Sequence, residues 1–131
     1  MNHYIIDTHA LVWFLEQSPK LGKNARNAFI DTDSILIIPT IVLAEIKILF
    51  DKNRFLTSLD EVFAVIENDS RCIVQPMDLD VVSMLPTKLE IHDAIITATA
   101  LLFKGNPYFK DVEIITKDEE ILKSKLVKTV W

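Results

Sequence analysis

Four acidic residues occupy positions from which their carboxylates could meet in a single site. Asp7 directly follows a short apolar run, and Asp118 lies just beyond another. Glu45 sits among apolar residues, and Asp93 begins a helix-length segment. Crowded carboxylates cannot all remain ionised without compensation, and Mg²⁺ or Mn²⁺ prefer such oxygen ligands. One or two such ions could bind a scissile phosphate and activate a water molecule, with no side-chain nucleophile required.

Three of these acids also have an ordinary structural explanation when they are taken singly. Asp7 and Asp118 can cap the helices that follow their strands, because a carboxylate accepts hydrogen bonds from the first backbone N–H groups of a helix. Asp93 can be favoured by the helix dipole. Only the joint pattern indicates one shared pocket.

Glu45 lies on a predicted apolar stripe, in register with Ile41, Ile48 and Leu49 at i, i+4, i+7 and i+8 spacing. A carboxylate on a buried face is costly unless it is paired or bound to metal. The alternative is that the stripe is turned slightly and that Glu45 pairs with a lysine at its edge. Both interpretations remain open at this point.

The elements that position these acids alternate between short strands and helices. The predicted strands are apolar and β-branched, as in a parallel sheet covered on both faces, and they span residues 4–6, 35–38, 72–74, 112–115 and 126–130. The predicted helices span residues 8–16, 21–31, 39–53, 58 onward, 78–85 and 91–103. This alternation predicts a three-layer α/β/α fold. Asp7 and Asp118 then lie at the carboxyl ends of strands, where open parallel sheets bind ligands.

Length and composition limit the classes of protein to consider. The 131 residues fit a single domain spanning 1–131, and one cysteine permits no internal disulfide. With only two glycines, neither a dinucleotide fingerprint nor a phosphate loop can be built. No apolar run is long enough to span a bilayer, so we expect a cytoplasmic protein without membrane contact. With a net charge of −5, the chain lacks the basic surface typical of broad nucleic-acid binding. Either nucleic acid is not the partner, which composition alone favours, or it is bound locally with metal ions supplying the positive charge.

The chain resembles a PIN domain, and within that superfamily the VapC-type toxins of toxin–antitoxin pairs. The similarity covers nearly the whole chain in the family's order. Its motifs are Tyr4 to Trp13, Pro39 to Ile46 with Glu45, His92 to Ala100 with Asp93, Ile114 to Asp118, and Val127 to Trp131.

The resemblance implies a five-stranded parallel sheet in the order 3-2-1-4-5. It implies an endoribonuclease that depends on one or two Mg²⁺ or Mn²⁺ ions held by Asp7, Glu45, Asp93 and Asp118. Thr116 is then expected to hydrogen-bond within the site. The family also implies an RNA substrate, a small inhibitory antitoxin and a homodimer.

One residue departs from the pattern of close relatives, which often have arginine after the third acid where this chain has Ala94. A basic contact is therefore missing there, and Lys117 is a candidate replacement. Lys47 is a second candidate for binding phosphate, although a solvated helix end explains it equally well. The departure also leaves room for a second function, a catalytically silent PIN-like module that binds RNA or protein.

Aromatic and histidine side chains near the acids allow two interpretations. Trp13 and the phenylalanines could stack on bases, but their helical spacing favours a core or a subunit interface. His9 and His92 adjoin Asp7 and Asp93. We expect them to orient neighbours or to be exposed, because hard oxygen sites seldom use imidazole.

Overall fold

The computed structural model describes all residues, 1–131, and contains one five-stranded, fully parallel sheet. Its strand order is β3-β2-β1-β4-β5, which confirms the predicted topology. The strands are β1 (His3–Ile6), β2 (Ile35–Pro39), β3 (Cys72–Gln75), β4 (Val112–Ile115) and β5 (Lys128–Val130). The strand order reverses between β1 and β4, so the crevice expected of such sheets lies beyond the carboxyl ends of these two strands.

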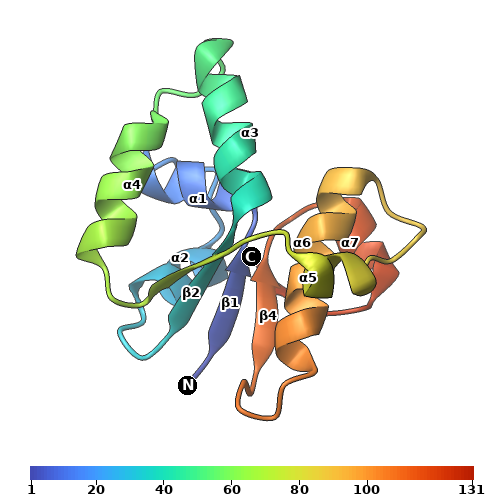
Figure 1. Cartoon of the computed structure of the whole chain (residues 1–131). Helices are drawn as coiled ribbons and strands as arrows, with labels where there is room; N and C mark the ends of the chain where they lie inside the picture. Colours follow the sequence, from blue (N-terminus) through green and yellow to red (C-terminus); the bar gives the residue numbers. More distant parts are fainter.

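Helices cover the sheet on both sides (Figure 1). One group lies beside β2 and β3, and it comprises α1 (Thr8–Leu15), α2 (Lys23–Ile30), α3 (Thr40–Asp51) and α4 (Leu59–Asn68). The other group lies beside β4, and it comprises α5 (Leu79–Ser83), α6 (Ile91–Lys104) and α7 (Glu119–Ser124). Residues of α3 and α6 approach one another. None of these helices combines the length and the apolar character needed to cross a lipid bilayer.

The core follows from the position of each strand in the sheet. Every residue of β1 is buried, since strands flank it on both sides and helices cover both faces. Ile5, Ile37 and Ile114 have no exposed surface. At the edge, Ile73 and Val74 of β3 remain more than a third exposed. The central strands therefore form the rigid frame from which Asp7 and Asp118 emerge.

Several element ends differ from the sequence-based expectation. The fifth strand begins at Lys128 rather than at residue 126, and the short helix α7 after β4 was not delimited. Asp7 is the N-cap of α1, as its ordinary structural explanation allowed, because its carboxylate accepts a hydrogen bond from the Thr8 N–H. Ser58 caps α4, with its hydroxyl accepting from the Glu61 N–H.

The buried stripe of α3 is not the predicted one. Val42 and Ile46 are its buried residues, whereas Ile48 is 53% exposed. The stripe is turned, as the alternative interpretation allowed, and Glu45 lies at its margin. The expected lysine partner is absent, because Glu45 faces His92 instead.

Candidate active site

Asp7 and Asp118 meet at the carboxyl edge of neighbouring strands. Ile6 of β1 pairs with Ile115 of β4, and the Asp7 N–H donates to the Ile115 carbonyl over 3.2 Å. The two parallel strands therefore end side by side. Asp7 is the first residue after β1, and Asp118 is the third residue after β4.

A hydroxyl group connects the two aspartates. Thr116 Oγ1 donates to Asp7 Oδ2 over 2.5 Å and accepts from the Asp118 N–H over 3.0 Å. The second oxygen of Asp7, Oδ1, accepts from the Thr8 N–H over 2.7 Å. Asp118 Oδ1 caps α7 by accepting from the Ile121 N–H over 3.0 Å. Both aspartates therefore act as helix caps, and these bonds also fix their carboxylates at the edge.

Glu45 and Asp93 approach the same edge from two helices. Glu45 is on α3, and its side chain is 23% exposed. Asp93 is the third residue of α6. His92 Nδ1 lies 3.8 Å from Glu45 Oε1 and 3.5 Å from Glu90 Oε1, which places the imidazole between two carboxylates.

Electrostatic coupling shows that the four acids share one environment. Burial, followed by the negative charges of Asp118, Asp7, Glu90 and Glu45, raises the pKa of Asp93 from 3.8 to about 6. Burial also raises the pKa values of Asp7 and Glu45. For Asp7 the hydrogen bond from Thr116 opposes the rise, and for Glu45 the charge of His92 opposes it. Such an arrangement is unfavourable unless a positive charge joins it.

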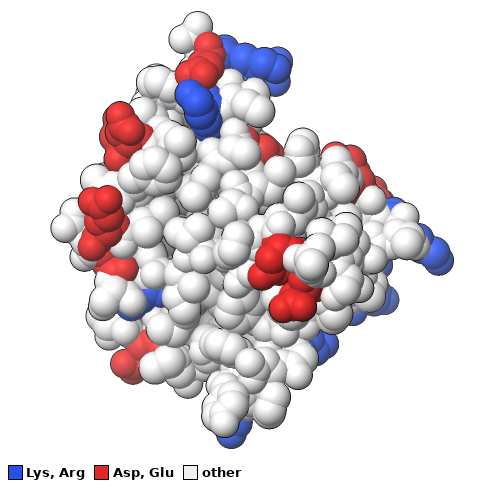
Figure 2. All heavy atoms as spheres, viewed as in Figure 1, with Lys and Arg blue, Asp and Glu red and all other residues white.

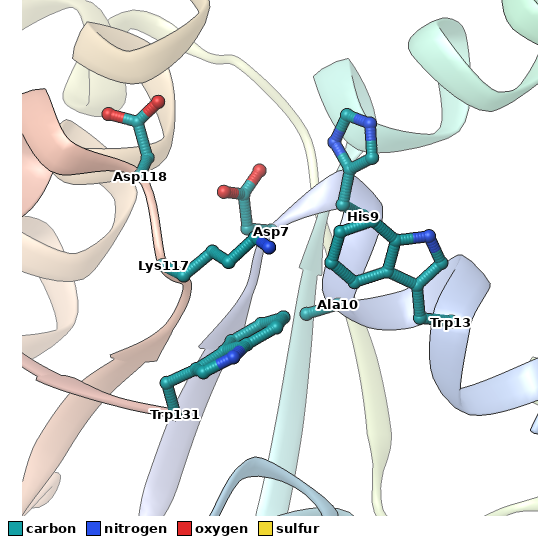
Figure 3. Close-up of a pocket in the computed structure, with 7 residues that line it drawn as sticks. All are labelled: Asp7, His9, Ala10, Trp13, Lys117, Asp118 and Trp131. Carbon is teal, nitrogen blue, oxygen red and sulfur yellow. The ribbon is translucent and has the colours of Figure 1, made fainter. Parts of the chain in front are cut away.

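A hollow of about 260 Å³ opens beside Asp7 and Asp118 (Figure 3). Its walls are formed by Asp7, His9, Ala10, Trp13, Lys117, Asp118 and Trp131. Lys117 is the one lysine or arginine among them, and its Nζ lies 4.8 Å from the ring centroid of Trp13. Glu45 and Asp93 are not part of this wall. The hollow thus combines two carboxylates, one ammonium group and two indoles.

The remaining candidate residues lie elsewhere. Lys47 is largely exposed and pairs with Asp51, with Nζ 3.5 Å from Oδ2, so the structure does not bring it to this hollow. Ala94 is buried, and only 4% of it is exposed. Lys117, which follows β4, is thus the one lysine or arginine that lines the hollow together with Asp7 and Asp118.

Trp131 is the residue of the hollow to which sequence analysis gave no role. The motif that ends in Trp131 was noted, but nothing local predicts that its indole meets Trp13. The contact depends on β5 pairing beside β4, which brings the end of β5 next to α1.

The chemistry of the donor set fits a hard divalent cation. The acids offer only carboxylate oxygens, and their raised pKa values reflect an excess of negative charge that a cation would offset. In the present arrangement no three His, Cys, Asp or Glu side chains stand close enough together to hold an ion. The carboxylates share one edge without forming a closed cage.

The surrounding surface carries few positive charges. Figure 2 shows one face of the molecule, on which acidic side chains form several clusters and basic side chains lie mainly at the rim. This agrees with the net charge of −5. Binding of a polyanion on this face therefore depends on local groups rather than on a broad basic surface.

Comparison with known proteins identifies the family. The PIN domain model matches residues 4–125, so the chain belongs to the PIN domain family. PIN domains are in general metal-dependent nucleases. No curated protein matches the chain. Among solved structures, the PIN domain endonuclease Utp24 is similar with 19% identity and a TM-score of 0.49, over 92% of this chain and 74% of that one.

Proposed function

We propose that this protein is a metal-dependent endoribonuclease and the toxin of a VapBC-type toxin–antitoxin pair. The observation that carries the nuclease function is the meeting of Asp7 and Asp118 at the carboxyl ends of β1 and β4, where the Thr116 hydroxyl bonds to both residues. The raised pKa of Asp93 supports it, because its causes include the charges of Asp7, Glu45 and Asp118. Four carboxylates from two strands and two helices thus act on one another at the sheet edge. Repulsion between these carboxylates is unfavourable in the absence of a counter-charge, and bound cations would offset it.

Asp7, Glu45, Asp93 and Asp118 would hold one or two Mg²⁺ or Mn²⁺ ions. When bound, such ions supply positive charge at the scissile phosphate and lower the pKa of a water molecule. The protein's own contribution is to position the ligands. Thr116 and the Thr8 N–H each donate to one oxygen of Asp7 and fix the orientation of its carboxylate, and the cap of α7 fixes Asp118.

Lys117 is proposed as the phosphate contact. It lines the hollow together with Asp7 and Asp118, and it is exposed, so its ammonium group can reach a substrate in the hollow. It would supply the positive charge that relatives place directly after the third acid, where Ala94 is buried here. Lys47 remains a weaker candidate, because its charge is paired with Asp51.

Protein partners are proposed from exposed apolar residues. Around α3 and α4, which project beyond the sheet in Figure 1, Ile48 is 53%, Phe63 43% and Leu56 83% exposed. Apolar side chains gathered on a surface often mark an interface. We propose that an antitoxin covers these residues and that two copies of the chain form a homodimer.

The test of the nuclease function is cleavage of a mixed RNA pool by the purified protein, with Mn²⁺ and with EDTA. Asp7→Asn should abolish cleavage while the protein stays folded. Asp33→Asn is the matched control, because Asp33 is exposed between α2 and β2, away from the hollow. Cleavage that persists in EDTA or in Asp7→Asn would rule out the proposed metal site. A folded protein that binds RNA without cleaving it would indicate the silent binding module.

The toxin role and the homodimer require separate tests. Expression of the wild type should arrest growth of a bacterial host, and expression of Asp7→Asn should not. Light scattering should give twice the mass of one chain. If the host grows normally although its lysate contains active nuclease, the toxin role is contradicted and the nuclease function stands.

A further inference from the structure

Two tryptophans form one wall of the hollow beside the acids. Trp13 projects from α1 and Trp131 follows β5, and their rings meet edge to face with centroids 5.8 Å apart at 69°. His9 extends this wall, with its ring centroid 5.2 Å from that of Trp13. Figure 3 shows the rings grouped beside Asp7 rather than turned away from it. The wall adjoins the edge where a scissile phosphate would lie.

The two indoles pack against the main core on one side and contact ammonium groups on the other. Both tryptophans are only partly buried. Lys117 Nζ lies 4.8 Å from the Trp13 centroid and 5.7 Å from that of Trp131, and Lys20 Nζ lies 5.7 Å from Trp13. The wall therefore combines π-faces with ammonium groups. A nucleotide has the complementary combination, because its base presents a π-face and its phosphates are anions.

Trp131 lies so close to Gly22 that no side chain fits between them. A Cβ added at Gly22 would lie 2.5 Å from the Trp131 carbonyl carbon and 2.6 Å from its Cδ1. Gly22 has a φ of −65°, which any residue adopts, so glycine is required here for space alone. Trp131 therefore packs directly against the backbone at the N-terminus of α2.

We propose that Trp13 and Trp131 form a stacking subsite for the base of an unpaired nucleotide adjoining the phosphate that is cleaved. The inference rests on the proposed nuclease function and specifies which side chains would hold an unpaired base beside the acids. Bases of a duplex are already stacked on each other and cannot reach the wall without unpairing. Every base has a π-face, so the subsite selects unpaired nucleotides rather than one base. Lys117 would leave the ring faces for the phosphate as the base enters.

Tryptophan fluorescence reports this wall alone, because the chain contains only these two tryptophans. Asp93→Asn protein with Mn²⁺ would be titrated with an RNA hexamer, with the same hexamer as a duplex, and with a hexamer that contains an abasic nucleotide. We expect the single strand to quench the fluorescence at low concentration. The duplex and the abasic strand should require roughly tenfold more RNA, as expected from the loss of one stacked base.

Variants separate stacking from structure. Trp13→Leu should raise the KM for cleavage of single-stranded RNA roughly tenfold with little change in kcat, and Trp13→Phe should restore most of the loss. Gly22→Ala should raise KM as well, because it displaces Trp131 without removing it. Tyr108→Leu is the matched control, since Tyr108 is 89% exposed and outside the hollow. Tm values would show that each variant folds.

The outcomes distinguish the subsite from the nuclease function. Metal-dependent cleavage without quenching, and with an unchanged KM in Trp13→Leu, would overturn the subsite and leave the nuclease standing. Quenching by single strands without any cleavage would support the subsite and remove the nuclease. Equal quenching by single strand and duplex would overturn the selection for unpaired nucleotides, and the absence of both signals would overturn both proposals.

Discussion

Thr116 donates a hydrogen bond to Asp7 across the ends of β4 and β1, with Oγ1 2.5 Å from Oδ2. The same hydroxyl accepts from the Asp118 N–H, so one buried threonine sets the spacing of two acids that follow different strands. This bond leaves Asp7 with a fixed orientation before any metal binds. A group that orients a metal ligand in this way affects metal binding without touching the ion.

Replacement of this hydroxyl should impair activity without unfolding the protein. Thr116→Val keeps the shape of the side chain and removes the hydrogen bonds to Asp7 and Asp118. We expect metal affinity or cleavage to fall about 10- to 100-fold. Thr116→Ser retains the hydroxyl and should stay within a few-fold of the wild type. The measurement is the initial rate of RNA cleavage against Mn²⁺ concentration, and equal rates for Val and Ser would contradict the role of this bond.

Divalent metal should stabilise the folded protein. Metal binds the assembled carboxylates and scarcely binds the unfolded chain, so Mn²⁺ at 100 times its Kd adds about 2.7 kcal/mol to the free energy of unfolding. The wild-type Tm should therefore rise by several degrees in Mn²⁺, and that of Asp93→Asn much less. Thermal unfolding followed by circular dichroism checks this. A wild-type Tm that stays flat across millimolar Mn²⁺ would exclude a metal site at these acids.

Without metal, the protein should become less stable as the pH rises. A salt-bridged carboxylate would give the opposite dependence. The pKa of Asp93 is raised from 3.8 to about 6, so the folded protein binds this proton more tightly than the unfolded chain. The free energy of unfolding in EDTA should then decrease as pH rises through this window and stay low above it. The raised pKa values of Asp7 and Glu45 act in the same direction.

Asp93→Asn tests the origin of this pH dependence. The amide has no charge, so the variant should be more stable than the wild type in EDTA at pH 7 and should lose much of the slope. Urea unfolding at several pH values measures both quantities. A wild-type slope that persists unchanged in Asp93→Asn would assign the effect to other groups.

Arg71 should be essential for stability but not for catalysis. Its Nη1 donates to the carbonyls of Phe29 and Asp31 over 2.9 and 2.6 Å, and its Nη2 pairs with Asp69 over 2.8 Å. These bonds tie the start of β3 to the end of α2, at the sheet edge opposite the acids. Arg71→Met leaves the carbonyls without this donor and should cost about 2–3 kcal/mol.

The measurement for Arg71→Met is the midpoint of urea unfolding, with cleavage assayed well below the Tm. The cleavage rate should equal that of the wild type, and Arg71→Lys should restore part of the stability. A normal midpoint for Arg71→Met would show that water replaces these bonds at no cost.

Much of the fold could be predicted because its signals are local. The buried, β-branched strands recur between helix-length segments, and residues that directly follow parallel strands share one edge of the sheet. This reasoning placed Asp7 and Asp118 at one edge, and the strand order implied by the family resemblance made their strands neighbours. The capping of α1 by Asp7 and of α7 by Asp118 could also be predicted, because an acid directly before a helix can accept from its first N–H groups.

The environment of Glu45 could not be predicted from periodicity. The spacing of Ile41, Glu45 and Ile48 suggested a single stripe, but the apolar residues of α3 exceed what one face can hold. Which of them is buried depends on how α1, α4 and α6 pack around the helix. Val42 and Ile46 occupy the core, Ile48 is exposed, and Glu45 is left facing His92.

The sequence by itself thus determined the sheet, its order and the edge where acids follow strands, because these depend on short-range pattern and on the family's motifs. Only the tertiary structure brought Trp131 beside Trp13 and set Lys117 over both rings. Those contacts join the end of β5, helix α1 and the loop after β4. No local sequence pattern predicts the contact between Trp13 and Trp131. It depends on the pairing of β5 with β4 and on the space that Gly22 leaves for the Trp131 indole.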